Sequence, residues 1–99
     1  MITIVYKKPY EKPYIMEIEN SLVKFQELVD GYIEVIPANE DGSILMVINE
    51  EGKLKGLEVN VYIGNTSIVG NVIFALRGKD GEFDSLTDDM INALIKILS

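Results

Sequence analysis

Residues 44–48 read Ile-Leu-Met-Val-Ile, an uninterrupted apolar run that lies between two polar turn sequences. Residues 39–42 (Asn-Glu-Asp-Gly) precede the run, and residues 49–52 (Asn-Glu-Glu-Gly) follow it. A short apolar run with turn residues at both ends is typical of a strand that is buried on both faces of a sheet. We therefore expect residues 44–48 to form a central strand.

Further strands are predicted on both sides of this run. They cover residues 2–6, 14–19, 32–36 and 68–76. Residues 2–6 place Ile2, Ile4 and Tyr6 on one face, and residues 14–19 alternate. A short proline-bearing connection separates the two strands, which predicts a hairpin. The last one is interrupted by Gly70 and Asn71. Residues 53–67 show only a brief alternation among glycines, so we expect a loop with one short strand there.

Two helices are predicted from their capping residues and apolar spacing. The first begins near Asn20 or Ser21, where either side chain could cap the free amides. It ends at Asp30-Gly31, and Gly31 is suited to the left-handed position that follows a helix. The second helix begins after Thr87, whose side chain can accept a hydrogen bond from an amide of the first turn.

The order of these elements is two strands, a helix, three or four strands and a second helix. It predicts an α+β fold, with a mostly antiparallel sheet of about five strands and both helices packed on one face. A chain of 99 residues is long enough for one modest core. We therefore expect residues 1–99 to form a single domain.

The composition excludes several kinds of chemistry. The chain has no Cys and no His, so it lacks thiol nucleophiles, disulfides and imidazole bases. Its net charge of −7 opposes direct binding to nucleic acid, because phosphate contacts need clustered Lys and Arg. No apolar run approaches the roughly 20 residues that cross a bilayer, and the N-terminal residues do not resemble a signal peptide. We expect a cytoplasmic protein that binds neither nucleic acid nor membranes.

Carboxylates are the remaining candidates for catalysis or metal binding. They occur in pairs at Glu17/Glu19, Glu40/Asp41, Glu50/Glu51 and Asp88/Asp89. A glycosidase-type pair must face across a cleft, whereas a pair in a turn faces water and a pair in the first turn of a helix complements the helix dipole. Neither acidic turn has the ligand spacing of a calcium loop. The sequence therefore predicts no catalytic residue, no metal site and no cofactor.

Residues 52–56 read Gly-Lys-Leu-Lys-Gly and depart from the acidic character of the chain. Lys53 and Lys55 could hold a phosphate or a carboxylate as point charges. No clear helix follows, so the segment does not fit a phosphate-binding loop that opens a helix. The alternative is an exposed segment whose lysines prevent aggregation.

Four stretches of the chain together resemble a known family. They are residues 31–37 (GYIEVIP), 49–60 (NEEGKLKGL, then Asn60), 68–74 (IVGNVIF) and 85–88 (SLTD). The chain resembles a family of short proteins of unknown function that is common in gut Firmicutes, their phages and mobile elements. The resemblance implies a phage or mobile-element setting, in which small accessory proteins often block host defences by binding something.

The resemblance also implies where a site should be sought. The residues that match the family's most specific segment are Asn49, Gly52, Lys53, Gly56 and Asn60. The chain departs from the family at Val59 and Val61, where proline or polar residues are expected beside the asparagine. The structure of the segment after Gly56 is therefore open.

Binding without turnover is the function class that these observations favour. In one version the protein sequesters a small nucleotide signal, with Lys53 and Lys55 on a phosphate. Tyr32 would then stack on the base, and Asn60 would contact a base or ribose edge. In a second version an acidic surface mimics DNA and blocks a host protein, and a third hypothesis is a carboxylate-based hydrolase. A homo-oligomer is also plausible, since small binding proteins often build pockets between subunits.

Overall fold

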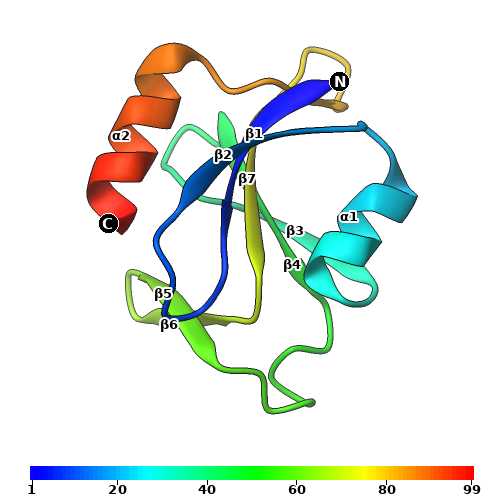
Figure 1. Ribbon diagram of the computed structural model, residues 1–99, viewed down its shortest axis with the longest axis vertical. Coiled ribbons are helices and arrows are strands. Elements are labelled where there is room, and N and C mark those ends of the chain that lie inside the picture. The colour runs from blue at the N-terminus through cyan, green and yellow to red at the C-terminus, as the bar shows by residue number, and fades with distance from the viewer.

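The computed structural model describes residues 1–99, and it contains eight strands and two helices (Figure 1). The strands are β1 (Ile2–Lys7), β2 (Tyr14–Ile18), β3 (Ile33–Pro37), β4 (Ile44–Asn49), β5 (Val59–Ile63), β6 (Thr66–Val69), β7 (Val72–Arg77) and β8 (Phe83–Asp84). The helices are α1 (Leu22–Val29) and α2 (Asp88–Leu98).

Six of the strands form one sheet in the order β2-β1-β7-β4-β3, with β8 paired to β7. All of its strand pairs are antiparallel. The α+β class and the mostly antiparallel sheet are therefore confirmed, with six strands where about five were expected. The predicted hairpin is β1–β2, in which Ile2 pairs with Ile18 and Tyr6 pairs with Tyr14.

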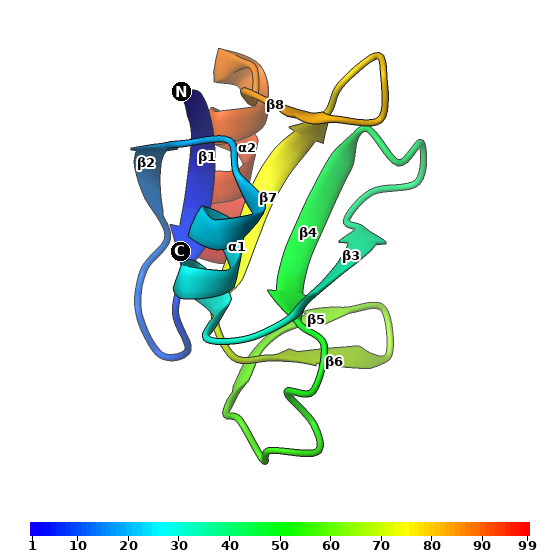
Figure 2. The same cartoon turned by 90° about the vertical axis from the view of Figure 1, so that its right-hand side faces the viewer.

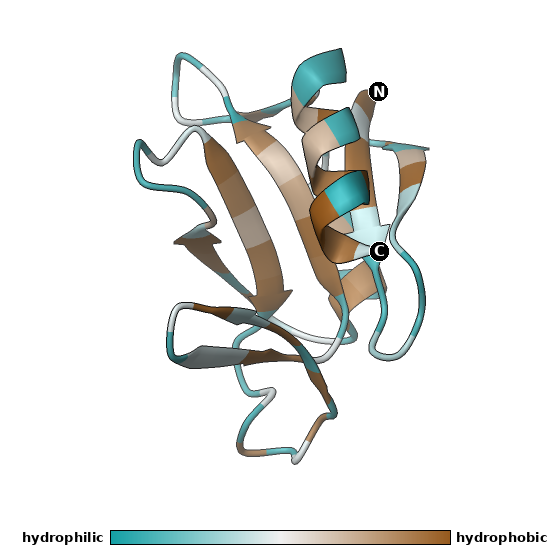
Figure 3. Ribbon diagram, turned by 90° about the vertical axis from the view of Figure 1, so that its left-hand side faces the viewer, coloured by the Kyte–Doolittle hydropathy of each residue, from teal (hydrophilic) through white to brown (hydrophobic).

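The predicted central strand is β4, which lies between β7 and β3. Residues 45–49 of this strand are all buried. Val47 faces one hydrophobic cluster, while Met46 and Ile48 face another on the opposite side of the sheet. Figure 3 shows the apolar residues concentrated in the strands of the sheet, whereas the connecting loops are mostly polar.

The two helices lie on opposite faces of the sheet, so the expectation that both pack on one face is wrong. The cluster under α1 contains Phe25 and Val29 together with Ile4 and Tyr6 of β1. The cluster under α2 contains Ile91 and Leu94 with other residues of β1, β4 and β7. Successive residues of a strand point to opposite faces, and the central strands are apolar on both, so each face needs its own cover. Figure 2 shows α1 in front of the sheet and α2 behind it.

Both helices begin at the predicted capping residues. The Ser21 hydroxyl accepts a hydrogen bond from the Lys24 amide, and the Thr87 hydroxyl accepts one from the Met90 amide, each at 3.2 Å. The end of α1 differs from the prediction, because Asp30 and not Gly31 takes the left-handed conformation, with φ of 64°. The helix itself ends at Val29, directly before Asp30-Gly31 as expected, and aspartate tolerates the left-handed region better than most side chains.

The segment predicted as a loop with one short strand is a two-stranded hairpin of its own. β5 pairs with β6 across a two-residue turn at Gly64-Asn65, with Gly64 at a φ of +59°. The predicted long strand over residues 68–76 is two strands in different sheets, divided at Gly70-Asn71. Gly70 has a φ of +77°, and a Cβ there would lie 2.9 Å from Leu57 Cδ1. A sharp turn and a close contact therefore divide the strand at this glycine.

Neither helix combines the length and the apolar character that a bilayer span requires.

Candidate functional site

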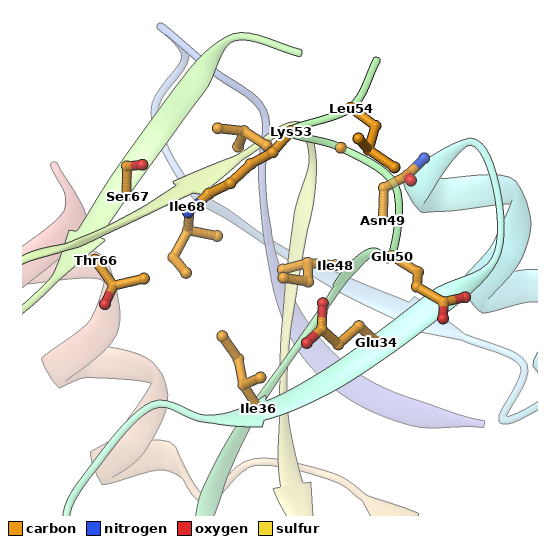
Figure 4. A pocket seen from close by; sticks show the side chains of 12 residues that line it. Glu34, Ile36, Ile48, Asn49, Glu50, Lys53, Leu54, Thr66, Ser67 and Ile68 are labelled. Atoms are coloured by element: carbon orange, nitrogen blue, oxygen red, sulfur yellow. The ribbon is translucent and has the colours of Figure 1, made fainter. Parts of the chain in front are cut away.

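A pocket of about 270 Å³ opens on the face of the sheet that carries α2, at the end that is bounded by β3 and β6 (Figure 4). It is lined by Glu34, Ile36, Ile48, Asn49, Glu50, Gly52, Lys53, Leu54, Thr66, Ser67, Ile68 and Val69. Ile48 and Ile68 belong to the hydrophobic cluster under α2, and Ile36 packs against it. The floor of the pocket is therefore the exposed end of the core, and its rim carries charged and hydroxyl groups.

Asn49 fixes one wall of the pocket. Its side chain is buried, and its Nδ2 donates to the carbonyl oxygens of Val29 and Asp30 at 3.0 and 3.3 Å. Its Oδ1 accepts a hydrogen bond from the Glu51 amide at 2.8 Å. One side chain thus joins the end of α1 to the start of the segment that follows β4. Because all of its hydrogen-bonding groups are engaged within the protein, Asn49 acts as a framework residue of the pocket.

Gly52 allows the segment after β4 to approach β6. A Cβ at this position would lie 2.8 Å from Val69 Cγ2, closer than real Cβ atoms come. The segment then closes on itself, since the Leu57 amide donates to the Gly52 carbonyl at 3.0 Å. Gly56 has a φ of +68°, which a glycine adopts easily, so it allows the chain to turn here. It lies outside the pocket lining.

The charged groups of the pocket lie on different walls. Glu34 belongs to β3, and Glu50 directly follows β4. Both residues are exposed. Figure 4 shows the nitrogen end of Lys53 directed toward β6, away from both carboxylates. Lys53 forms no ion pair within the protein. The pocket therefore has a negative side along β3 and a positive side along β6.

Lys55 does not join Lys53 in the pocket. Its Nζ lies 3.9 Å from Glu51 Oε1, in an ion pair between residues four positions apart along the chain. Tyr32 is 67% exposed and also lies outside the pocket lining. The structure thus brings together three of the seven predicted ligand-binding residues, namely Asn49, Gly52 and Lys53.

Asn60 lies in a separate network that holds the β5–β6 hairpin against the sheet. Its Nδ2 donates to the carbonyls of Lys7 and Gly70 at 2.8 and 2.7 Å. Its Oδ1 accepts a hydrogen bond at 2.9 Å from Lys7 Nζ, which belongs to a buried side chain. Asn60 therefore positions the hairpin whose second strand walls the pocket, without lining the pocket itself.

Sequence reasoning missed the contributions of β3 and β6. Glu34 and Ile36 are two residues apart on β3, so they point to the same face, and the pairing of Glu34 with Ile48 shows which face that is. The alternation was visible in the sequence, but the side it faces depends on strand order. Thr66 and Ser67 fell in a segment that was predicted as a loop.

The structure contains no group of three or more Asp, Glu, His or Cys side chains that could hold a metal ion. Of the carboxylate pairs noted in the sequence, Glu50/Glu51 contributes one member to the pocket lining, and Figure 4 shows the carboxylates of Glu34 and Glu50 directed apart. No buried side-chain nitrogen or oxygen lacks a hydrogen-bond partner.

The comparisons with known proteins place the chain in a family without adding an activity. A search of the curated proteins and a search of the solved structures gave no match. A family model described as "Domain of unknown function (DUF3846)" matches residues 2–99. The match extends over almost the whole chain, and this protein therefore belongs to the DUF3846 family.

Proposed function

We propose that this domain acts by binding without turnover, and that the pocket between β3, β6 and residues 49–54 is its binding site. The observation that carries the proposal is the pocket itself, in which an apolar floor meets charged groups of both signs. Binding sites typically combine such a floor with a few polar groups that set orientation. The hydrogen bonds of Asn49 support it further, because they hold the wall in place before any ligand arrives.

The charges favour a ligand that joins an apolar part to a cationic group. Glu34 and Glu50 line the pocket against one cation, Lys53, and the whole chain carries a net charge of −7. An amine or guanidinium group would meet the Glu34 carboxylate while its carbon chain covers Ile36 or Ile48. A nucleotide signal remains the competing ligand, with Lys53 on its phosphate. Lys55 and Asn60 would have no part in that binding, because they lie outside the pocket.

The setting that we propose is the cytoplasm of a cell that carries a phage or a mobile element. The resemblance of residues 49–60 to proteins from phages and mobile elements supports this setting. There the domain would interfere with host defence by occupying a host component. An acidic binding protein suits a basic partner, which is the interaction expected of a DNA mimic.

Titration followed by ¹⁵N–¹H correlation spectra tests the pocket directly. The probes are agmatine, which carries a guanidinium on a four-carbon chain, and 5′-AMP. We expect agmatine to shift the amide signals of Ile48, Gly52 and Ser67. The variant Glu34→Gln/Glu50→Gln should weaken this binding about tenfold or more, as loss of charge-assisted hydrogen bonds does.

A matched control removes two carboxylates elsewhere. Glu17→Gln/Glu19→Gln makes the same change in net charge at the β2 edge, and it should leave agmatine binding unchanged. Shifts with 5′-AMP that disappear in Lys53→Ala would favour the nucleotide version instead. Absence of shifts at the pocket with both probes would show that this pocket is not the binding site.

A carboxylate-based hydrolase is the second candidate, because Glu34 and Glu50 line one pocket. Retaining and inverting glycosidases use such pairs. Incubating the protein with a bound ligand and then chromatographing the released material separates the two functions. Intact ligand supports binding, whereas product formed over many turnovers and lost in Glu34→Gln would establish hydrolysis.

A further inference from the structure

β3 is an edge strand with an open side. It pairs with β4 and has no neighbour on its other side, because it stands at the end of the order β2-β1-β7-β4-β3. The Glu50 amide donates to the Tyr32 carbonyl at 2.9 Å, and the Ala38 amide donates to the Ile44 carbonyl at 2.8 Å. The even-numbered residues of this segment therefore bond to β4, since hydrogen-bonded pairs alternate along an antiparallel ladder.

The odd-numbered residues of β3 consequently direct their backbone groups to the open side. Ile33 and Val35 each present an amide and a carbonyl there, and Pro37 presents a carbonyl only. The open stretch is short, and its far end is closed to further pairing by the proline. It has the length to pair with about five residues of an extended chain.

The side chains beside this edge alternate between two environments. Glu34 and Ile36 point into the pocket. Val35 points to the other face and is 41% exposed, although its strand pairs with the buried strand β4. A strand added at this edge would therefore place every second side chain over the pocket and the others beside Val35.

We propose that β3 pairs with an extended segment of a basic partner protein, and that a Lys or Arg of this segment enters the pocket at Glu34. This inference rests on the proposed function, because it names the kind of partner that the same pocket accepts. Charge complementarity selects the occupant, since Glu34 of the open strand lines the pocket and the chain as a whole is strongly acidic. Backbone pairing gives affinity, and the alternate side chains give specificity.

The test uses a peptide that matches this pattern, acetyl-Thr-Ile-Val-Arg-Thr-amide. Paired antiparallel to β3, it places its Ile beside Ile36 and its Arg beside Glu34. A second peptide has the same side chains but carries N-methyl groups on Val and on the last Thr. In the paired strand, Val would lie opposite Val35 and the last Thr opposite Ile33. Binding is followed by ¹⁵N–¹H spectra and by hydrogen exchange of the whole protein.

We expect the first peptide to shift the pocket signals and to slow exchange of the Ile33 and Val35 amides. The N-methylated peptide should bind at least about tenfold more weakly, because it lacks the donors that reach the β3 carbonyls. A peptide with Glu in place of Arg should also bind at least about tenfold more weakly, since its carboxylate would lie beside that of Glu34. In the protein, Val35→Pro removes the outward amide without touching a hydrogen bond to β4, and it should weaken binding of the first peptide.

Other results would overturn the inference in distinguishable ways. Equal binding of the two peptides, or binding of agmatine without binding of either peptide, would refute strand pairing and leave the pocket as the binding site. Failure of both peptides, agmatine and 5′-AMP would refute the proposed function as well. Protection of the Ile33 and Val35 amides in a dimer of the protein alone would show that the edge belongs to a second copy of this chain.

Discussion

Replacing Asn49 by alanine should remove the main fixed point between α1 and the pocket wall. The change deletes two donated hydrogen bonds and one accepted hydrogen bond. The carbonyl of the buried residue Val29 is then left without a hydrogen-bond partner, which costs about 1–3 kcal/mol of folding free energy. Asp30 and Glu51 are exposed, so their freed backbone groups can turn to water at a smaller cost. We expect a total loss of about 2–4 kcal/mol in the free energy of unfolding.

That loss is large for a domain of this size, whose total stability is about 5–15 kcal/mol. It should lower Tm by on the order of 10–20 °C and the urea midpoint by roughly 1–2 M. Urea unfolding followed by circular dichroism measures it. The matched control is Asn92→Ala, because Asn92 is exposed on α2, and this variant should stay within about 0.5 kcal/mol of the parent.

A value for Asn49→Ala within about 0.5 kcal/mol of the parent protein would refute the reasoning, because it would mean that the three hydrogen bonds contribute nothing net. Spectra of the variant at low temperature give a second readout. If Asn49 holds the wall, the amide signals of Glu51 and Gly52 should shift more than those of β2, which lies at the opposite edge of the sheet.

Three further predictions concern the framework of the fold. Burial raises the pKa of Tyr6 to about 12, so the stability that this phenol contributes is complete below pH 10 and is lost as the pH rises through 12. Tyr6→Phe should therefore flatten the decline in the free energy of unfolding over this pH range, and an unchanged decline would contradict the prediction. Gly52→Ala should cost about 1–3 kcal/mol in thermal unfolding because its Cβ meets Val69, and a neutral effect would show that β6 gives way. Lys7→Met and Asn60→Ala should each destabilise the protein by about 1–2 kcal/mol, because Lys7 donates a hydrogen bond to Asn60. The double variant should lose less than the sum of the two, and strict additivity in a double-mutant cycle would show that the side chains are uncoupled.

Local features of the fold could be predicted from the sequence because they depend on neighbouring residues. The caps at Ser21 and Thr87 and the buried strand over residues 44–48 are of this kind. The placement of the helices could not be predicted, because it depends on which strands become neighbours, and β7 pairs with strands far away in the chain. The hairpin at residues 59–69 had a signal in its Gly64-Asn65 turn, but the nearby glycines obscured it.

The candidate site was predicted only where it follows from a single segment. Asn49, Gly52 and Lys53 are close in sequence and do line the pocket. Their roles differ from the prediction, because Asn49 and Gly52 shape the wall and only Lys53 offers a free charge. Glu34 could not be assigned to the site in advance, since its position opposite Ile48 is set by pairing between two strands.

The central position of β7 has a consequence for how the chain assembles. The N-terminal hairpin and the β3–β4 hairpin have no strand pairing with each other, and β7 joins them by pairing with β1 on one side and β4 on the other. Val5 therefore meets Phe74 only after nearly three-quarters of the chain has left the ribosome. Until then each hairpin has an unpaired apolar edge, so we expect a late, long-range step to set the rate of folding. Substitutions in β7 should accordingly slow refolding more than equally destabilising ones in β2.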